Sequence, residues 1–136
     1  PINRGLKGCV RFNMEVDIEK TRTFYSSLKS DTLCDCGDCR NYYLQIKSTY
    51  PEVDKYLSKL GIDIEKPYET SPLEPKVGFL EYCACQYIVF GTCDAEYHHQ
   101  IGSVEFRLAK SYPSTGVKEE HFVLEFYPIR LNYTAI

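Results

Sequence analysis

Hydrophobic and polar residues alternate along the first part of the chain. Apolar side chains occupy every second position, at Val10, Phe12, Met14, Val16 and Ile18. A period of two over ten residues is typical of a β-strand that buries one face and exposes the other. We therefore predict a strand over 10–19. The less regular segment 22–29 predicts a second strand, with the polar residues 19–22 as the hairpin turn.

The period then changes to that of helices. Tyr43 and Ile46, together with Tyr42, fit one face of a short helix over 38–47, and Asp38 is a suitable N-cap.

A second helix is marked at both ends. Pro51 suits a first turn, and Gly61 stands just past the expected end. The apolar residues between them recur at i, i+3, i+4 and i+7, at Val53, Tyr56, Leu57 and Leu60. Residues 38–61 thus predict a helical hairpin.

The rest of the chain returns to strand patterns. A loop follows the hairpin and contains Pro67, Pro72 and Pro75. Residues 79–90 predict one long strand or two short ones, ended by Gly91, and strands are predicted at 103–108 and at 122–127. The segment 111–118 joins the last two as a hairpin loop. The order β-β-α-α-β-β-β contains no repeated βα unit. It predicts an α+β fold: an antiparallel sheet of about five strands, single or packed as a sandwich, with a helical hairpin inserted after the second strand.

Size and composition narrow the classes of protein. The 136 residues fit one domain, 1–136, and 43% hydrophobic with 26% charged residues is ordinary for a globular core. A net charge of −3 with scattered Lys and Arg argues against a nucleic-acid partner. No apolar stretch approaches the roughly 20 residues of a membrane-spanning helix, so a membrane role is not expected.

Seven cysteines are an odd number at short spacings, which indicates reduced thiols and a cytoplasmic protein.

The candidate chemistry lies in the spacing C-x-C-x-x-C formed by Cys34, Cys36 and Cys39, in a loop that enters a helix. Zinc favours thiolate ligands, and a helix N-terminus stabilises the thiolate form, whereas Asp35 and Asp38 oppose it. Three ligands do not complete a structural zinc site.

A fourth ligand has to come from elsewhere in the chain. Cys83 and Cys85 are the first candidates, since they are two apart on a predicted strand and would share one face. They are equally suited to the core, where free Cys packs as a small hydrophobe. The further candidates are Cys93, His98, His99 and His121.

Three interpretations of the cysteines stay open: unliganded thiols, which the ligand count narrowly favours, a structural zinc site, and thiol catalysis. Catalysis needs a base, and His98 and His99 would face opposite ways on a strand. No phosphate-binding glycine loop, nucleophile elbow or H-E-x-x-H zinc motif is present.

The stretch from Cys34 to Tyr43, followed by Tyr50-Pro51-Glu52-Val53 and Leu57-Ser58-Lys59-Leu60-Gly61-Ile62-Asp63, resembles a group of small uncharacterised bacterial proteins. In that group a C-x-x-C-R-N-[FY] element precedes a helix that ends in a leucine-glycine turn. The resemblance covers about thirty residues and implies a helical hairpin whose C-x-x-C pair is Cys36 and Cys39. It implies no activity, and Cys83 and Cys85 depart from the group's pattern.

Two hypotheses for function follow. The first is a non-enzymatic accessory or binding module that recognises a protein or small ligand through a surface rich in its 12 tyrosines. Strand propensity offers the plainer explanation for those tyrosines, a half-exposed sheet face. The second hypothesis is a thiol- or metal-dependent enzyme that uses Cys36 and Cys39 with a histidine.

Overall fold

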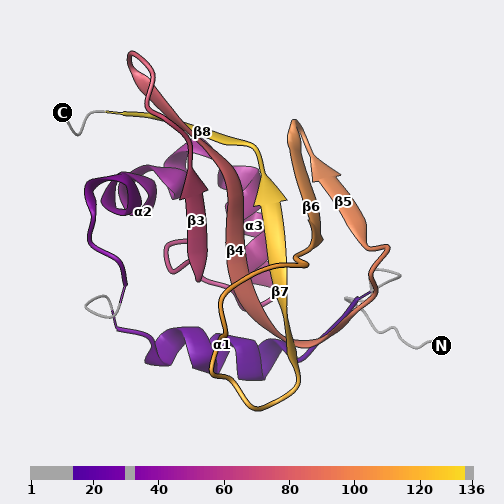
Figure 1. Cartoon of the computed structure of the whole chain (residues 1–136). Helices are drawn as coiled ribbons and strands as arrows, with labels where there is room; N and C mark the ends of the chain where they lie inside the picture. The colour runs from indigo at the N-terminus through magenta and orange to yellow at the C-terminus, as the bar shows by residue number, and fades with distance from the viewer. Residues whose placement is uncertain (1–13, 30–32, 134–136) are drawn as a thin grey trace.

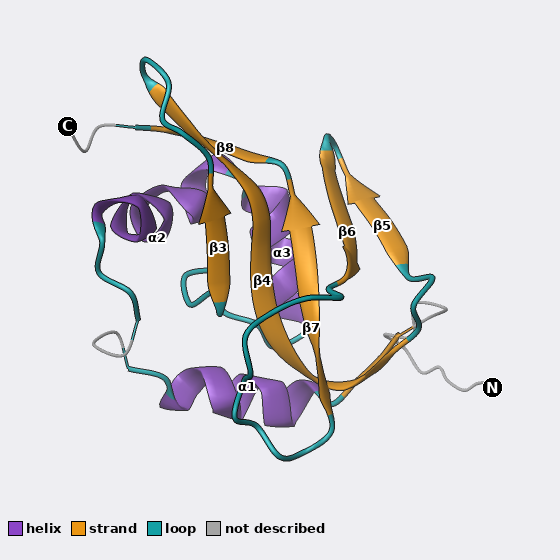
Figure 2. Cartoon of the chain, viewed as in Figure 1, coloured by secondary structure: helices purple, strands orange, loops and turns teal. Residues whose placement is uncertain are grey.

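The computed structural model describes residues 14–29 and 33–133, and within them it contains three helices and a sheet of seven strands (Figure 1; Figure 2). The helices are α1 (Ile18–Ser27), α2 (Gly37–Thr49) and α3 (Pro51–Lys59). The strands are β2 (Met14–Val16), β3 (Glu69–Pro72), β4 (Phe79–Cys93), β5 (His98–Ile101), β6 (Val104–Leu108), β7 (His121–Tyr127) and β8 (Ile129–Asn132).

The long strand β4 organises the sheet. The main order is β2-β4-β7-β6-β5, and both β3 and β8 also pair with β4. Every pairing is antiparallel. This confirms the predicted α+β class and the antiparallel sheet. The described strands form one sheet rather than a sandwich, and β3, β5 and β8 were not predicted.

The segment predicted as the second strand is helix α1, so the prediction for 22–29 and for its hairpin turn is wrong. Asp17 caps the helix, because its side chain accepts a hydrogen bond from the backbone N–H of Lys20 at 3.1 Å. Thr21 and Tyr25 lie one turn apart on the buried face. The Thr21 hydroxyl accepts from the Phe90 N–H at 3.1 Å, which ties the helix to β4.

The predicted first strand ends earlier than expected. Strand β2 covers Met14–Val16, and Ile18 already belongs to α1. Residues 10–13 lie outside the described residues. The alternation through residue 18 therefore spans a strand and the first turn of a helix.

Helices α2 and α3 confirm the two predicted helices, but they follow α1 instead of a second strand. Tyr50 alone joins them. The predicted stripe of α3 is largely in the core, since Val53 and Leu57 are buried, as is Leu60 just after the helix. Gly61 has φ +89, the left-handed conformation that follows many helix ends.

Strand β4 continues past Gly91 to Cys93, so the prediction that Gly91 ends the strand is wrong. Gly91 has φ +135, and a Cβ there would lie 2.0 Å from the backbone oxygen of Glu15. Glycine lets β2 approach β4 closely at this point, where Val16 pairs with Gly91.

The inward face of β4 changes phase near its middle. Leu80 and Tyr82 belong to the core, and so do Cys85, Tyr87 and Val89. The spacing between successive core residues is two, except for a step of three from Tyr82 to Cys85. The paired strands β7 and β8 make the matching step, from Phe126 to Ile129.

Both faces of the sheet are covered. In Figure 1, α3 lies behind β4 and β7, while the loop between β6 and β7 crosses in front and α1 lies at the base. The core takes up many of the tyrosines expected at a surface: Tyr25, Tyr42, Tyr82, Tyr87 and Tyr97 are buried. The hydroxyl groups of Tyr42 and Tyr87 meet at 2.6 Å, and Tyr87 donates to the Ile64 carbonyl at 2.6 Å. In the part of the chain that the structure describes, none of the helices is long and apolar enough to span a bilayer.

Candidate metal centre

The three clustered cysteines lie where the chain enters α2. The helix starts at Gly37, and the backbone N–H of Arg40 donates to the Cys36 carbonyl at 2.9 Å. Cys36 is therefore the N-cap residue. The prediction that Asp38 caps the helix is wrong, because Asp38 lies in the first turn, where a carboxylate still favours the positive end of the helix dipole.

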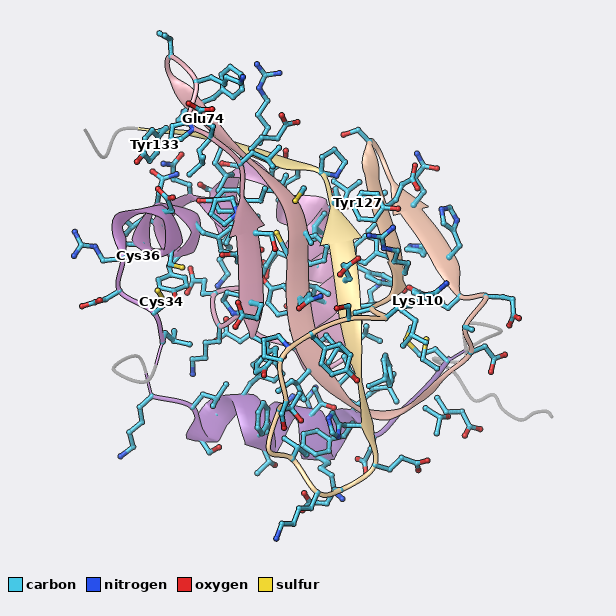
Figure 3. All side chains as sticks on the ribbon, in the orientation of Figure 1. Cys34, Cys36, Glu74, Lys110, Tyr127 and Tyr133 are labelled. Carbon is cyan, nitrogen blue, oxygen red and sulfur yellow. The ribbon has the colours of Figure 1, made fainter. Side chains whose placement is uncertain are left out.

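The sulfur atoms of Cys34, Cys36 and Cys39 all lie within 4.8 Å of one another. Two ligands of a tetrahedral zinc ion with Zn–S bonds of about 2.3 Å are about 3.8 Å apart, so a small contraction would let all three bind one ion. Among residues 14–29 and 33–133, this is the only group of three or more cysteine, histidine or carboxylate side chains placed in this way. Figure 3 shows Cys34 and Cys36 beside each other at the start of α2.

Hydrogen bonds from several elements fix the backbone of this segment. The Tyr43 hydroxyl donates to the Cys34 carbonyl at 2.7 Å. The Tyr82 hydroxyl, from β4, donates to the Asp38 carbonyl at 2.7 Å. Asn41 donates to the backbone oxygen of Asn132 at 2.8 Å, which ties α2 to β8. The cluster thus rests on a rigid scaffold, as a preorganised site requires.

The three thiols do not share one environment. Cys34 and Cys36 are exposed, while Cys39 is half-buried. The backbone amide of Cys39, with further help from the neighbouring thiols, lowers the pKa of Cys36. Burial raises the pKa of Cys39 to about 12. The thiol whose pKa is lowered is thus exposed at a helix N-terminus, next to a more buried thiol.

The cysteines also form part of a cavity of about 640 Å³. Phe24 and Leu28 of α1 line it, together with Tyr43 of α2 and Thr70 of β3. The Thr70 hydroxyl lies 3.8 Å from the Cys39 sulfur. A cavity of this size and lining is typical of sites for small ligands.

Cys83 and Cys85 lie outside the cluster. Cys83 is exposed and Cys85 is buried, so the prediction that they share one face is wrong. The phase change of β4 between Tyr82 and Cys85 is the reason. Cys85 packs in the core, and its burial raises the pKa of the thiol.

The other candidate ligands make their contacts with other side chains. His98 and His99 lie on β5, where His98 reaches Glu105 at 3.4 Å and His99 stacks on Tyr56 with ring centroids 4.4 Å apart. His121 on β7 contacts Thr115 at 2.8 Å. Cys93 is half-buried at the end of β4. Within the described residues, none of these side chains joins the three sulfur atoms.

Two residues of the site were not predicted. Tyr43 was assigned only to a helix face, although its position four residues after Cys39 places it on the cysteine side of α2. Thr70 lies in a segment that was predicted to be a loop. The weak period of 69–72 gave no signal for a strand, and the prolines argued against one.

Comparison with known proteins gives no family: no protein-family model matches the chain. Searches of the curated proteins and of the solved structures find no significant match either.

Proposed function

We propose that this domain is a metal-binding module that holds one zinc ion through the thiolates of Cys34, Cys36 and Cys39. The observation that carries the proposal is the convergence of the three sulfur atoms within 4.8 Å where the chain enters α2. Thiolates are the ligands that zinc and other thiophilic ions prefer. A reducing compartment such as the cytoplasm, which the sequence predicts, would keep the three thiols available.

Elemental analysis of the purified, reduced protein tests this proposal. We expect one equivalent of zinc per chain. Replacing Cys34, Cys36 or Cys39 individually by serine should weaken zinc binding about 100-fold or more, because each change removes one ligand.

Cys83→Ser is the matched control, since it removes an exposed thiol outside the cluster. It should retain the full equivalent of zinc. Equal zinc content in all four variants, or none in the wild-type chain, contradicts the proposal.

A second candidate function is thiol–disulfide exchange by Cys36 and Cys39. The closeness of the two sulfur atoms, which lie within 4.8 Å of each other, favours it. The Cys36 thiolate would attack a small-molecule disulfide and displace one thiolate. Cys39, on losing its proton, would then attack the Cys36 sulfur, release the second thiolate and close the Cys36–Cys39 disulfide. The small disulfide is reduced to two thiols, and the two cysteines are oxidised.

Cys34→Ser separates the two candidates. Exchange needs only Cys36 and Cys39, so this variant would keep full oxidation by glutathione disulfide, measured as loss of two thiols per chain. Zinc binding needs all three thiolates, and the same variant would lose it. We favour zinc because it uses every member of the cluster.

A further inference from the structure

The zinc site proposed above would have three protein ligands at the edge of a cavity, and this arrangement points to a ligand. Structural zinc sites have four protein ligands, whereas sites that engage small molecules have three and keep one position for water or ligand. Residues 14–29 and 33–133 supply three such ligands and no fourth at the cluster. As far as the described residues go, the fourth position would thus be left to water or to a bound ligand.

The cavity determines what can reach that position. Cys34, Cys36 and Cys39 all line the same cavity of about 640 Å³, so an ion held by their sulfurs is bound at its wall. The remaining wall is mostly apolar or aromatic. It draws on α1 and its C-cap, α2, β3 and the loop before β7, through Phe24, Leu28, Tyr43, Pro72 and Val117. The ligand body that fits such a wall is itself apolar.

Two charged side chains, Lys66 and Glu69, line the cavity, and Glu69 is exposed to solvent. The ammonium group of Lys66 already donates to the Tyr25 carbonyl at 2.8 Å and the Leu28 carbonyl at 3.0 Å. This lysine therefore holds the end of α1 in place. Recognition of the ligand head then falls to the metal, and recognition of the ligand body to the apolar wall.

The donor atom follows from the ligands already present. Three thiolates give the ion a soft, electron-rich environment, in which a further thiolate is a better match than a carboxylate oxygen. We propose that the fourth position takes a small thiol whose aryl or alkyl body occupies the cavity between α1 and β3. This inference rests on the proposed zinc site.

The test uses cobalt(II) in place of zinc, because its absorption bands report the ligand set. The chain carries Cys83→Ser, so that this exposed thiol cannot contribute. Benzyl mercaptan and 2-mercaptoethanol, which share a thiol donor but differ in the body attached to it, are titrated into the cobalt-loaded protein.

Both thiols should shift the cobalt absorption bands, and benzyl mercaptan should bind at least about tenfold more tightly, because its ring is removed from water. Benzoate supplies an oxygen donor on the same ring and should bind more weakly than benzyl mercaptan.

Val117→Phe adds bulk to the cavity wall, and Val77→Phe makes the same change at a fully exposed position outside it. The first should weaken benzyl mercaptan about tenfold or more while 2-mercaptoethanol and cobalt loading stay unchanged. The second should change none of the three. Cobalt loading also verifies that each variant is folded.

The outcomes test the zinc site and the cavity ligand separately. A chain that binds no cobalt overturns the proposed zinc site, and this inference with it. Four results in a chain that binds cobalt would overturn the cavity ligand alone. They are no band shift with either thiol, equal affinity for the two thiols, tighter binding of benzoate than of benzyl mercaptan, and no effect of Val117→Phe.

Discussion

The chain contains the spacing C-x-C twice, at residues 34–36 and at residues 83–85. The first motif lies in a loop and at a helix cap, where two exposed thiols meet that of Cys39. The second lies on β4 across the phase change, so that Cys83 faces water and Cys85 faces the core. The backbone on which a motif lies thus decides whether its thiols come together.

Aspartate replacements should separate the two motifs most strongly. Cys85→Asp places a carboxylate in the core beside Tyr42 and Tyr87, and we expect it to cost more than about 4 kcal/mol of unfolding free energy. Cys34→Asp lies in an exposed loop and should change stability by less than about 0.5 kcal/mol. Urea unfolding followed by circular dichroism measures both. Near-native stability of Cys85→Asp would contradict the burial of this strand.

Glycine replacements give the next largest contrast. Gly91→Ala on β4 should cost about 3 kcal/mol, because its φ of +135 is unfavourable for alanine and the new methyl group would meet the Glu15 carbonyl. Gly37→Ala, at the first position of α2 beside Cys36, has open space around its Cβ and should be neutral or slightly stabilising. Thermal unfolding of the two variants side by side tests this. A comparable loss in both would show that the start of α2 is as tightly packed as β4.

Thiol chemistry gives the smallest and most local contrast. Cys85→Ser should cost about 1–2 kcal/mol, since it places a hydroxyl in a core position, whereas Cys83→Ser should stay within about 0.5 kcal/mol. In the native protein, iodoacetamide should modify Cys83 and leave Cys85 untouched until urea is added. Peptide mass spectrometry after a timed reaction identifies the modified residue. Equal labelling of both residues would place Cys85 at the surface.

Secondary structure was predicted correctly where the pattern of a segment fitted only one type of element. The stripe around Val53 and Leu57, bounded by Pro51 and Gly61, fits a helix and little else, and α3 lies there. The strands β6 and β7 likewise follow their alternating residues. Each of these segments carries its own end signals and a single period.

The prediction failed at α1 because it followed local strand propensity. Thr23, Phe24 and Tyr25 favour strands, and Asp17 was taken as a polar strand position rather than as an N-cap. The contacts that decide the matter are long-range: the Thr21 hydroxyl bonds to the Phe90 amide, and the Tyr25 hydroxyl donates to the Ile88 carbonyl at 2.8 Å. No local pattern contains them.

The candidate site was predictable in part. Local spacing alone placed Cys34, Cys36 and Cys39 in one loop at a helix start, and the structure brings them together there. The cavity was not predictable, because its wall joins segments as far apart as Phe24 and Val117. The separation of Cys83 from Cys85 needed the pairing of β4 with β7 and β8.

The phase change in β4 couples the number of residues between Tyr82 and Cys85 to the number between Phe126 and Ile129. Core residues step by three at Tyr82–Cys85 and again at Phe126–Ile129, and the pairing register is the same on both sides of the step. Deleting one residue between Tyr82 and Cys85 alone would offset one half of the ladder from the other. Deleting a second residue between Phe126 and Ile129 would restore the match, with the same side chains facing inward. Insertions and deletions at these two places should therefore be tolerated only in pairs.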